Sequence, residues 1–162
     1  MKYSTNRGIP RHLVSCTVNR ILTKRHIIVE LISAFFVLLF AYTAVNKLVT
    51  YNIFVDELSK SPYLEKYAVA IGWLIPVTEL LIALMLVNRR TRIMGLFASF
   101  GIMLAFTIYI YMMLHYSHYI PCSCGGILAQ MSWQQHLVFN GISCLLALAG
   151  ISFSIIKPKP SL

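Results

Sequence analysis

The sequence predicts an all-α protein: an integral membrane bundle of four transmembrane helices, with both termini in the cytoplasm. Three observations lead to this class: the composition, the length of the apolar segments and the placement of the basic residues. Hydrophobic residues make up 58% of the 162 residues and charged residues only 12%, against about 25% charged residues in a typical soluble domain. A chain this apolar is expected to lie in a lipid bilayer rather than in water.

Residues 1–25 form a basic leader that we expect in the cytoplasm. The leader is long for the charged region of a signal peptide, and the apolar run after it is too long for a signal peptide and has no small-residue cleavage site. We therefore expect the first span to be retained and the leader to form either a flexible tail or a short surface helix. Cys16 is expected to stay a free thiol, because disulfides are rare in the cytoplasm.

Residues 26–157 form the membrane domain, and residues 158–162 form a short cytoplasmic tail. Crossing a hydrocarbon core of about 30 Å takes about 20 apolar residues in a helix. A membrane-spanning strand would need only about ten residues and would alternate in polarity, so the length of the runs indicates helices. The four spans are expected at about residues 27–49, 67–87, 93–114 and 133–156.

The basic residues predict the orientation of the bundle. Eleven fall on one side: six in the leader, three between the second and third spans, and two at the C-terminal end. Three fall on the other side: Lys47, Lys60 and Lys66. Because cytoplasmic segments carry the excess of Lys and Arg, loops 50–66 and 115–132 are expected to face the periplasm across a bacterial inner membrane. Basic residues placed between apolar runs also argue against nucleic acid as a partner, which needs a folded basic face.

The sequence Cys122-Ser123-Cys124-Gly125-Gly126 follows the third span and concentrates the reactive side chains of the chain. We expect it on the outer face, where disulfides persist. A disulfide between two cysteines separated by one residue closes a strained ring, and strain makes a disulfide easier to reduce. The pair therefore favours thiol–disulfide exchange over a structural cross-link.

Two other interpretations of this loop stay open. The cysteines could only fix a turn, or they could bind zinc or copper with a histidine, because Cys/His sets bind these metals. The histidines that flank the loop are His115, His118 and His136. For exchange chemistry, His136 is the candidate catalytic residue beside the two cysteines, since a nearby histidine can raise the thiolate fraction.

Glu79 lies near the middle of the second span, where an ionisable side chain is costly unless it faces the bundle and has a partner. Pro76, one turn earlier, frees the carbonyl of Gly72 from its helical hydrogen bond, so we expect a local polar site. Glu79 could be a proton acceptor or an anchor for a small redox cofactor such as a quinone, or it could only fix helix packing. Its candidate partners are Asn140 in the fourth span and Thr43, Asn46 or Lys47 in the first.

The fourth span carries a polar face. Its members, Trp133, His136, Asn140 and Cys144, recur at spacings of three and four. A neighbouring stripe of small residues, typical of close helix contact in lipid, indicates that this side points into the bundle. The stripe consists of Ser143, Ala147, Gly150 and Ser154. His136 would then lie beneath the cysteine loop, with Asn140 deeper as a candidate cofactor contact. Cys144 is expected to be inert packing.

Lys47, which closes the first span, is expected to extend toward the outer interface. Lysines near the ends of spans usually bury the aliphatic stem and keep the ammonium group in water.

Four groups of residues together resemble a known family: Asn46-Lys47-Leu48, Pro76 with Glu79, Cys122-Ser-Cys124-Gly-Gly, and Trp133 with His136 and Asn140. Over residues 26–156 the chain resembles the MauE-type, DoxX-like family of redox-associated membrane proteins with four helices. The resemblance implies a part in methylamine utilisation, in the maturation of a disulfide-rich periplasmic dehydrogenase subunit beside a thioredoxin-like partner. It also implies that Cys122 and Cys124 are the exchanging pair.

The leading hypothesis from the sequence is a membrane-embedded thiol–disulfide redox protein, a component of an oxidoreductase that exchanges electrons with a periplasmic thioredoxin-like partner. Cys16 and Cys144 are single and distant, so a quinone is the candidate for a second redox centre. One alternative is a non-catalytic membrane subunit that anchors or assembles a larger envelope complex. The other is an outer-face metal site made by cysteine and histidine.

Overall fold

The computed structural model describes residues 11–60, 64–116 and 132–155, with the side chains of the first helix described from Arg25 onward. These stretches form, in chain order, helices α1 (Arg11–Val49) and α2 (Tyr51–Ser59), the 3-10 turn η1 (Glu65–Tyr67), and helices α3 (Ala68–Val87), α4 (Arg92–Tyr116) and α5 (Trp133–Ile155). They contain no strand, which confirms the all-α prediction. The segments long and apolar enough to cross a membrane are Arg25–Val49, Glu65–Val87, Arg92–His115 and Trp133–Ile155, close to the predicted spans.

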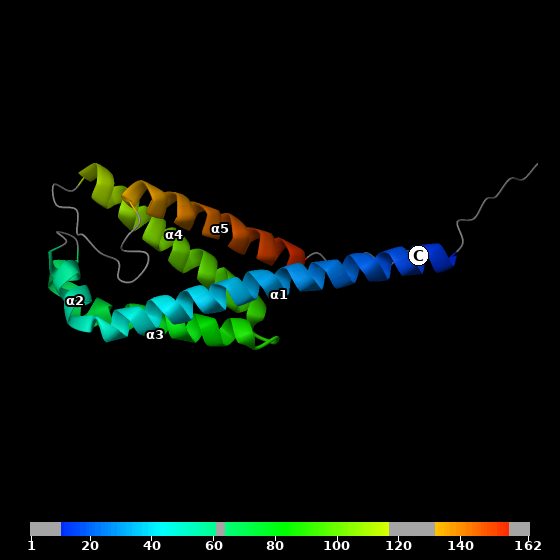
Figure 1. Cartoon of the computed structure of the whole chain (residues 1–162), viewed down its shortest axis with the longest axis horizontal. Helices are drawn as coiled ribbons and strands as arrows, with labels where there is room; N and C mark the ends of the chain where they lie inside the picture. The colour runs from blue at the N-terminus through cyan, green and yellow to red at the C-terminus, as the bar shows by residue number, and fades with distance from the viewer. Residues whose placement is uncertain (1–10, 61–63, 117–131, 156–162) are drawn as a thin grey trace, which may run out of the picture.

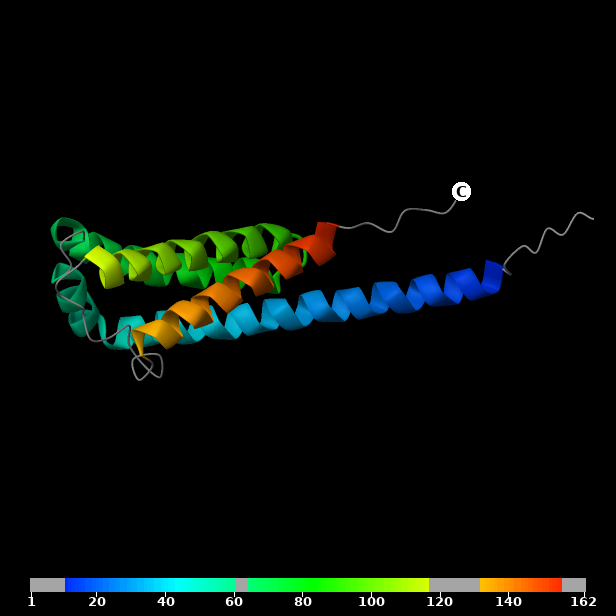
Figure 2. The same ribbon diagram turned by 90° about the horizontal axis from the view of Figure 1, so that it is seen from above.

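The four long helices lie side by side as a bundle in which neighbours run in opposite directions (Figures 1 and 2). Helices α1 and α4 each pack mainly against α3 and α5, and contact each other little across the diagonal. We call the end of the bundle where α1 and α4 finish and α3 and α5 begin the loop end. We call the opposite end, which carries the turn between α3 and α4, the arginine end.

The interior is filled by apolar side chains. Phe36 and Phe40 of α1 are almost fully buried, and their rings stack with centroids 5.7 Å apart. Glycine lets α5 approach its neighbours, since a Cβ atom on Gly150 would lie 3.2 Å from Ile32 of α1 and 3.3 Å from Leu96 of α4. Three members of the predicted inward stripe are buried, which confirms that prediction: Ser143, Ala147 and Gly150.

The outside of the bundle is apolar, as lipid contact requires. Leu38 of α1 is 71% exposed, and Leu84 of α3 and Leu145 of α5 are each 67% exposed. Side chains of this size would be costly to leave in water, and in a bilayer they face hydrocarbon.

Helix α1 continues well beyond the bundle at the arginine end. Residues 11–24, part of the predicted leader, are helical and run straight on from the first span, so α1 projects past the other helices in both views (Figures 1 and 2). This backbone forms neither a separate tail nor a separate surface helix. Residues 1–10 of the leader lie outside the described part of the chain.

Helix α2 folds over the loop end, where the sequence predicts only a loop. It starts after a break at Thr50, whose hydroxyl donates to the Asn46 carbonyl at 2.8 Å. The helix then packs against the start of α3 at Gly72, where an added Cβ would lie 2.7 Å from the Val55 side chain. Only glycine permits this approach, and it brings α2 across the top of the bundle interior.

Candidate functional site

A buried ion pair joins α1 to α3 in the half of the bundle nearest the loop end. The ammonium Nζ of Lys47 lies 2.7 Å from Oε1 of Glu79 and donates a hydrogen bond to it. The two side chains are only 9% and 1% exposed, respectively. Lys47 was among the predicted partners of Glu79, and that prediction is confirmed.

The prediction that Lys47 extends to the outer interface is wrong, and helix direction supplies the reason. Side chains on a helix tilt toward its N-terminus. Helix α1 runs toward the loop end, so the side chain of Lys47 points back into the bundle. Helix α3 runs the opposite way, so Glu79 points toward the loop end, and the two charged groups meet between the helices.

Aromatic rings complete the surroundings of the ammonium group. Nζ of Lys47 lies 5.9 Å from the ring centroid of Phe54 in α2 and 5.7 Å from that of Phe106 in α4. Cations are attracted to the faces of aromatic rings at such distances. Lys47 therefore contacts groups from α2, α3 and α4, and it links the small outer helix to the membrane bundle.

Helix α5 adds His136 and Asn140, which are 9% and 2% exposed. The indole of Trp133 stacks on the His136 ring at a centroid distance of 6.4 Å, and the charge of Lys47 acts on the same imidazole. The prediction that this face of the fourth span points inward is thus confirmed for both residues. We call Thr43, Lys47, Glu79, His136 and Asn140 the polar core.

Two atoms of the polar core have no hydrogen-bond partner among the described residues. They are Oε2 of Glu79, an acceptor, and Nδ2 of Asn140, a donor, and both are buried. Thr43 of α1 is a further polar neighbour of the Glu79 carboxylate. Buried polar atoms are rarely left unpaired in proteins, and the exceptions often mark a bound ligand or water. The polar core therefore has free hydrogen-bonding capacity of both kinds.

Proline and threonine shape α3 next to Glu79. Pro76 is buried inside the helix, which continues through it from Ala68 to Val87. The hydroxyl of Thr78 donates to the Ile75 carbonyl at 2.8 Å and so turns back onto its own helix. Glu79 is consequently the residue of this segment whose polar group reaches across to another helix.

The cysteine pair itself lies outside the described residues. Cys122, Cys124 and His118 belong to segment 117–131, which follows the end of α4 and precedes the start of α5, both at the loop end (Figure 1). His115 is exposed and stacks on Tyr111 with centroids 4.2 Å apart. No group of three or more metal-ligating side chains occurs within the described stretches, and the proposed Cys/His metal set includes residues beyond them.

Cys144 is a buried free thiol within the apolar core of the bundle. This position agrees with the prediction that it is packing. The side chain of Cys16 lies outside the described residues.

Comparison with known proteins identifies the family of this chain. The profile described as "Methylamine utilisation protein MauE" matches residues 25–153, which include the first three spans, nearly all of the fourth and the whole polar core. The chain belongs to the MauE family. No curated protein and no solved structure matches it. The match shows the MauE family and does not test the wider DoxX-like resemblance.

Membership of the MauE family identifies a multi-pass membrane protein associated with methylamine utilisation. The surroundings of Lys47 include two residues that the sequence did not single out. Phe54 and Phe106 are ordinary apolar residues in sequence, and only their position over Lys47 distinguishes them. The sequence did contain a signal for Lys47, because a single acidic residue inside one span requires a basic partner from another span.

Proposed function

We propose that this chain is a thiol–disulfide redox protein of the inner membrane that exchanges electrons with a periplasmic thioredoxin-like partner through Cys122 and Cys124. The observation that carries the proposal is the placement of the polar core. His136 lies three residues into α5, at the end of the bundle where the cysteine segment leaves α4 and enters α5. MauE membership supports the same biological setting.

The exchange needs no other reactant than the partner's disulfide or dithiol. A thiolate of one cysteine attacks a sulfur of the partner's disulfide, forms a mixed disulfide and releases a partner thiolate. The second cysteine then attacks the mixed disulfide, so that Cys122 and Cys124 become joined and the partner leaves as a dithiol. Two electrons pass to the partner, and the two protons lost by Cys122 and Cys124 protonate the partner's two thiolates. The reverse sequence reduces the pair.

His136 is the proposed proton acceptor for the attacking thiol. A histidine near a cysteine raises the fraction of thiolate, which is the nucleophile. The charges of Lys47 and Glu79 balance each other, so neutral His136 lies in the same buried region without an unpaired charge there.

A quinone is the second component of the proposal. The free donor of Asn140 and the free acceptor of Glu79 match the needs of a quinone carbonyl and a quinol hydroxyl, respectively. Oxidation of the Cys122/Cys124 dithiol to a disulfide would supply the two electrons and two protons that convert quinone to quinol. Asn140→Leu should then slow reduction of a short-chain quinone by the reduced protein, while Cys144→Ser should not.

The central experiment follows the redox state of the pair. The protein in nanodiscs is incubated with an oxidised or a reduced thioredoxin-class protein, quenched with acid, alkylated and measured by mass spectrometry. We expect two alkyl groups on the cysteine peptide after reduction and none after oxidation. His136→Gln should slow this exchange at least about tenfold, with His115→Gln as the matched control. A pair that never forms a disulfide, or a Cys122→Ser/Cys124→Ser variant that changes the partner's redox state as the wild type does, would refute the proposal.

The proposed orientation puts the loop end in the periplasm and both termini in the cytoplasm. It is supported by the basic residues, eleven of which belong to the arginine-end side. A membrane-impermeant maleimide added to intact spheroplasts should label Cys122 and Cys124 after reduction. Labelling only after the membrane is broken would place the pair on the wrong side for a periplasmic partner.

The alternative of a non-catalytic assembly subunit draws on the small residues of the fourth span. Those residues are used inside the bundle, where Gly150 contacts Ile32 and Leu96. The stripe is therefore accounted for without a second protein, and we favour exchange.

A further inference from the structure

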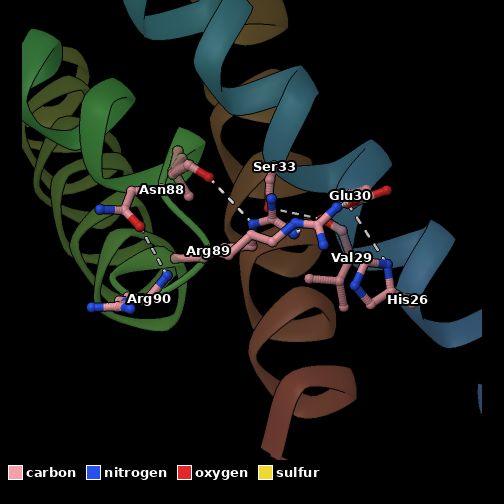
Figure 3. A network of polar contacts seen from close by, with 9 residues as sticks. His26, Val29, Glu30, Ser33, Asn88, Arg89 and Arg90 are labelled. Atoms are coloured by element: carbon pink, nitrogen blue, oxygen red, sulfur yellow. Dashed lines mark hydrogen bonds and ion pairs between the residues drawn. The ribbon is translucent and has the colours of Figure 1, made fainter.

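The arginine end carries a cluster of charged groups around one carboxylate (Figure 3). Oε1 of Glu30 on α1 lies 3.3 Å from a guanidinium nitrogen of Arg89, 3.7 Å from one of Arg92, and 3.7 Å from Nδ1 of His26. Arg89 and Arg92 belong to the junction of α3 and α4, so Glu30 ties this junction to α1. We call Glu30, Arg89, Arg90 and Arg92 the arginine cluster.

The cluster has a large excess of positive charge. Glu30 is its single acidic residue, against three arginines, and Arg25 lies only five positions before Glu30 on α1. The other four acidic residues of the chain are in α2, η1 and the middle of α3: Asp56, Glu57, Glu65 and Glu79. One carboxylate cannot neutralise this end of the bundle.

The three arginines differ in how much of their hydrogen-bonding capacity is used. The side chain of Arg92 is 15% exposed, and its Nε donates to the Leu86 carbonyl at 3.3 Å, so it holds the end of α3. The side chain of Arg89 is 75% exposed, and Arg90 is also exposed. A guanidinium has five N–H donors, so Arg89 keeps several after its contact with Glu30.

The turn that carries the exposed arginines is itself ordered by hydrogen bonds. The backbone N–H of Arg90 donates to Oδ1 of Asn88 at 3.0 Å, and the Thr91 hydroxyl donates to the Met85 carbonyl at 2.9 Å. The two guanidinium groups therefore project from a fixed base. A preorganised site loses less entropy when it binds a ligand.

Apolar surface begins directly beside the cluster. The following side chains, each within about one helical turn of a cluster residue, are exposed: Ile27 50%, Leu31 65%, Val87 62% and Ile93 44%. In a bilayer these side chains face the hydrocarbon, so the arginines lie at the depth of the lipid headgroups. Phosphate groups are found at this depth, and arginine binds phosphate in a bidentate geometry.

We propose that the arginine cluster is a binding site for the phosphate headgroup of an anionic phospholipid. Arg89 and Arg90 supply the donors, Arg92 and Glu30 hold the turn against α1, and the neighbouring apolar side chains contact the acyl chains. The site is independent of the cysteine chemistry proposed above. Its charge complementarity and its position beside hydrocarbon-facing residues favour a lipid over a soluble anion.

The test measures which lipids stay on the protein. The full chain, in mixed micelles containing equal amounts of phosphatidylglycerol and phosphatidylethanolamine, is analysed by native mass spectrometry, and the ratio of the two bound lipids is measured. We expect phosphatidylglycerol to be retained in preference. Each cation near the headgroup contributes about fivefold to anionic-lipid binding, so Arg89→Gln/Arg90→Gln should lower the ratio about 25-fold. Lys60→Gln/Lys66→Gln removes the same charge at the loop end and should leave the ratio unchanged.

The substitution Glu30→Gln should change the ratio of the two bound lipids in the opposite direction. Loss of the carboxylate raises the local positive charge, so the ratio should increase about fivefold. An equal effect of the loop-end control, or no preference for phosphatidylglycerol in the wild type, would overturn the proposal. Release of the bound lipid by millimolar inorganic phosphate would also overturn it, because the cluster would then be a general anion site.

Discussion

The two ends of the bundle hold their carboxylates in opposite ways. Glu79, near the loop end, is 1% exposed and has one charged partner, Lys47, at 2.7 Å. Glu30, at the arginine end, is 41% exposed and shares one oxygen among Arg89, Arg92 and His26 at 3.3 to 3.7 Å. The difference follows from the surroundings: a charge removed from water must be balanced within the protein, whereas at the membrane surface water, salt and lipid headgroups can balance an excess.

The largest expected effect is on the buried pair. Lys47→Met or Glu79→Leu alone would leave one unpaired charge in the bundle and should lower the free energy of unfolding by about 3–5 kcal/mol. The double variant Lys47→Met/Glu79→Leu removes both charges and should recover most of this loss. Reversible unfolding in mixed micelles with sodium dodecyl sulfate measures all three. If each single variant is as stable as the double variant, the stability of the protein does not depend on pairing these two charges.

A smaller effect is expected from moving α2 away from the pair. Gly72→Val places a side chain where Val55 already lies 2.7 Å from the Cβ position, so α2 and Phe54 should shift, at a cost of about 1–3 kcal/mol. Lys47 would then be open to water, and the stability of the protein should become sensitive to salt, as that of an exposed pair is. Adding Val55→Ala should relieve the clash. If Gly72→Val alone changes neither stability nor salt sensitivity, α2 does not seal the polar core.

The smallest effect is expected at Glu30. Because its ion pairs are exposed and longer, Glu30→Gln should change the free energy of unfolding by less than about 1 kcal/mol. The change should shrink further at high salt, in contrast to the effect of Glu79→Leu. Unfolding at low and high ionic strength measures both. A loss at Glu30 as large as that at Glu79 would remove the distinction between the two ends.

The two ends of the bundle also differ in their proposed functions. The loop end combines a buried, charge-balanced ion pair with the connection that carries Cys122 and Cys124, an arrangement that suits the proposed exchange of protons and electrons. The arginine end combines exposed guanidinium groups with hydrocarbon-facing side chains, an arrangement suited to holding the protein in an anionic leaflet. Neither proposal depends on the other.

The sequence by itself determined the four spans and which side of the fourth span faces inward. Both follow from local patterns: an apolar run of about 20 residues must become a helix in lipid to satisfy its backbone, and small residues such as Gly150 recur on the face where helices touch. The sequence also marked Glu79, because an acid at that depth requires a partner.

Only the tertiary structure decided which partner Glu79 has and what surrounds it. Lys47 lies at the end of its span, where the usual expectation is an outward side chain, but the opposite directions of α1 and α3 turn both charged groups toward each other. Phe54 reaches Lys47 because α2 folds back over Gly72. These contacts depend on the packing of helices distant in sequence, and no local pattern of residues encodes them.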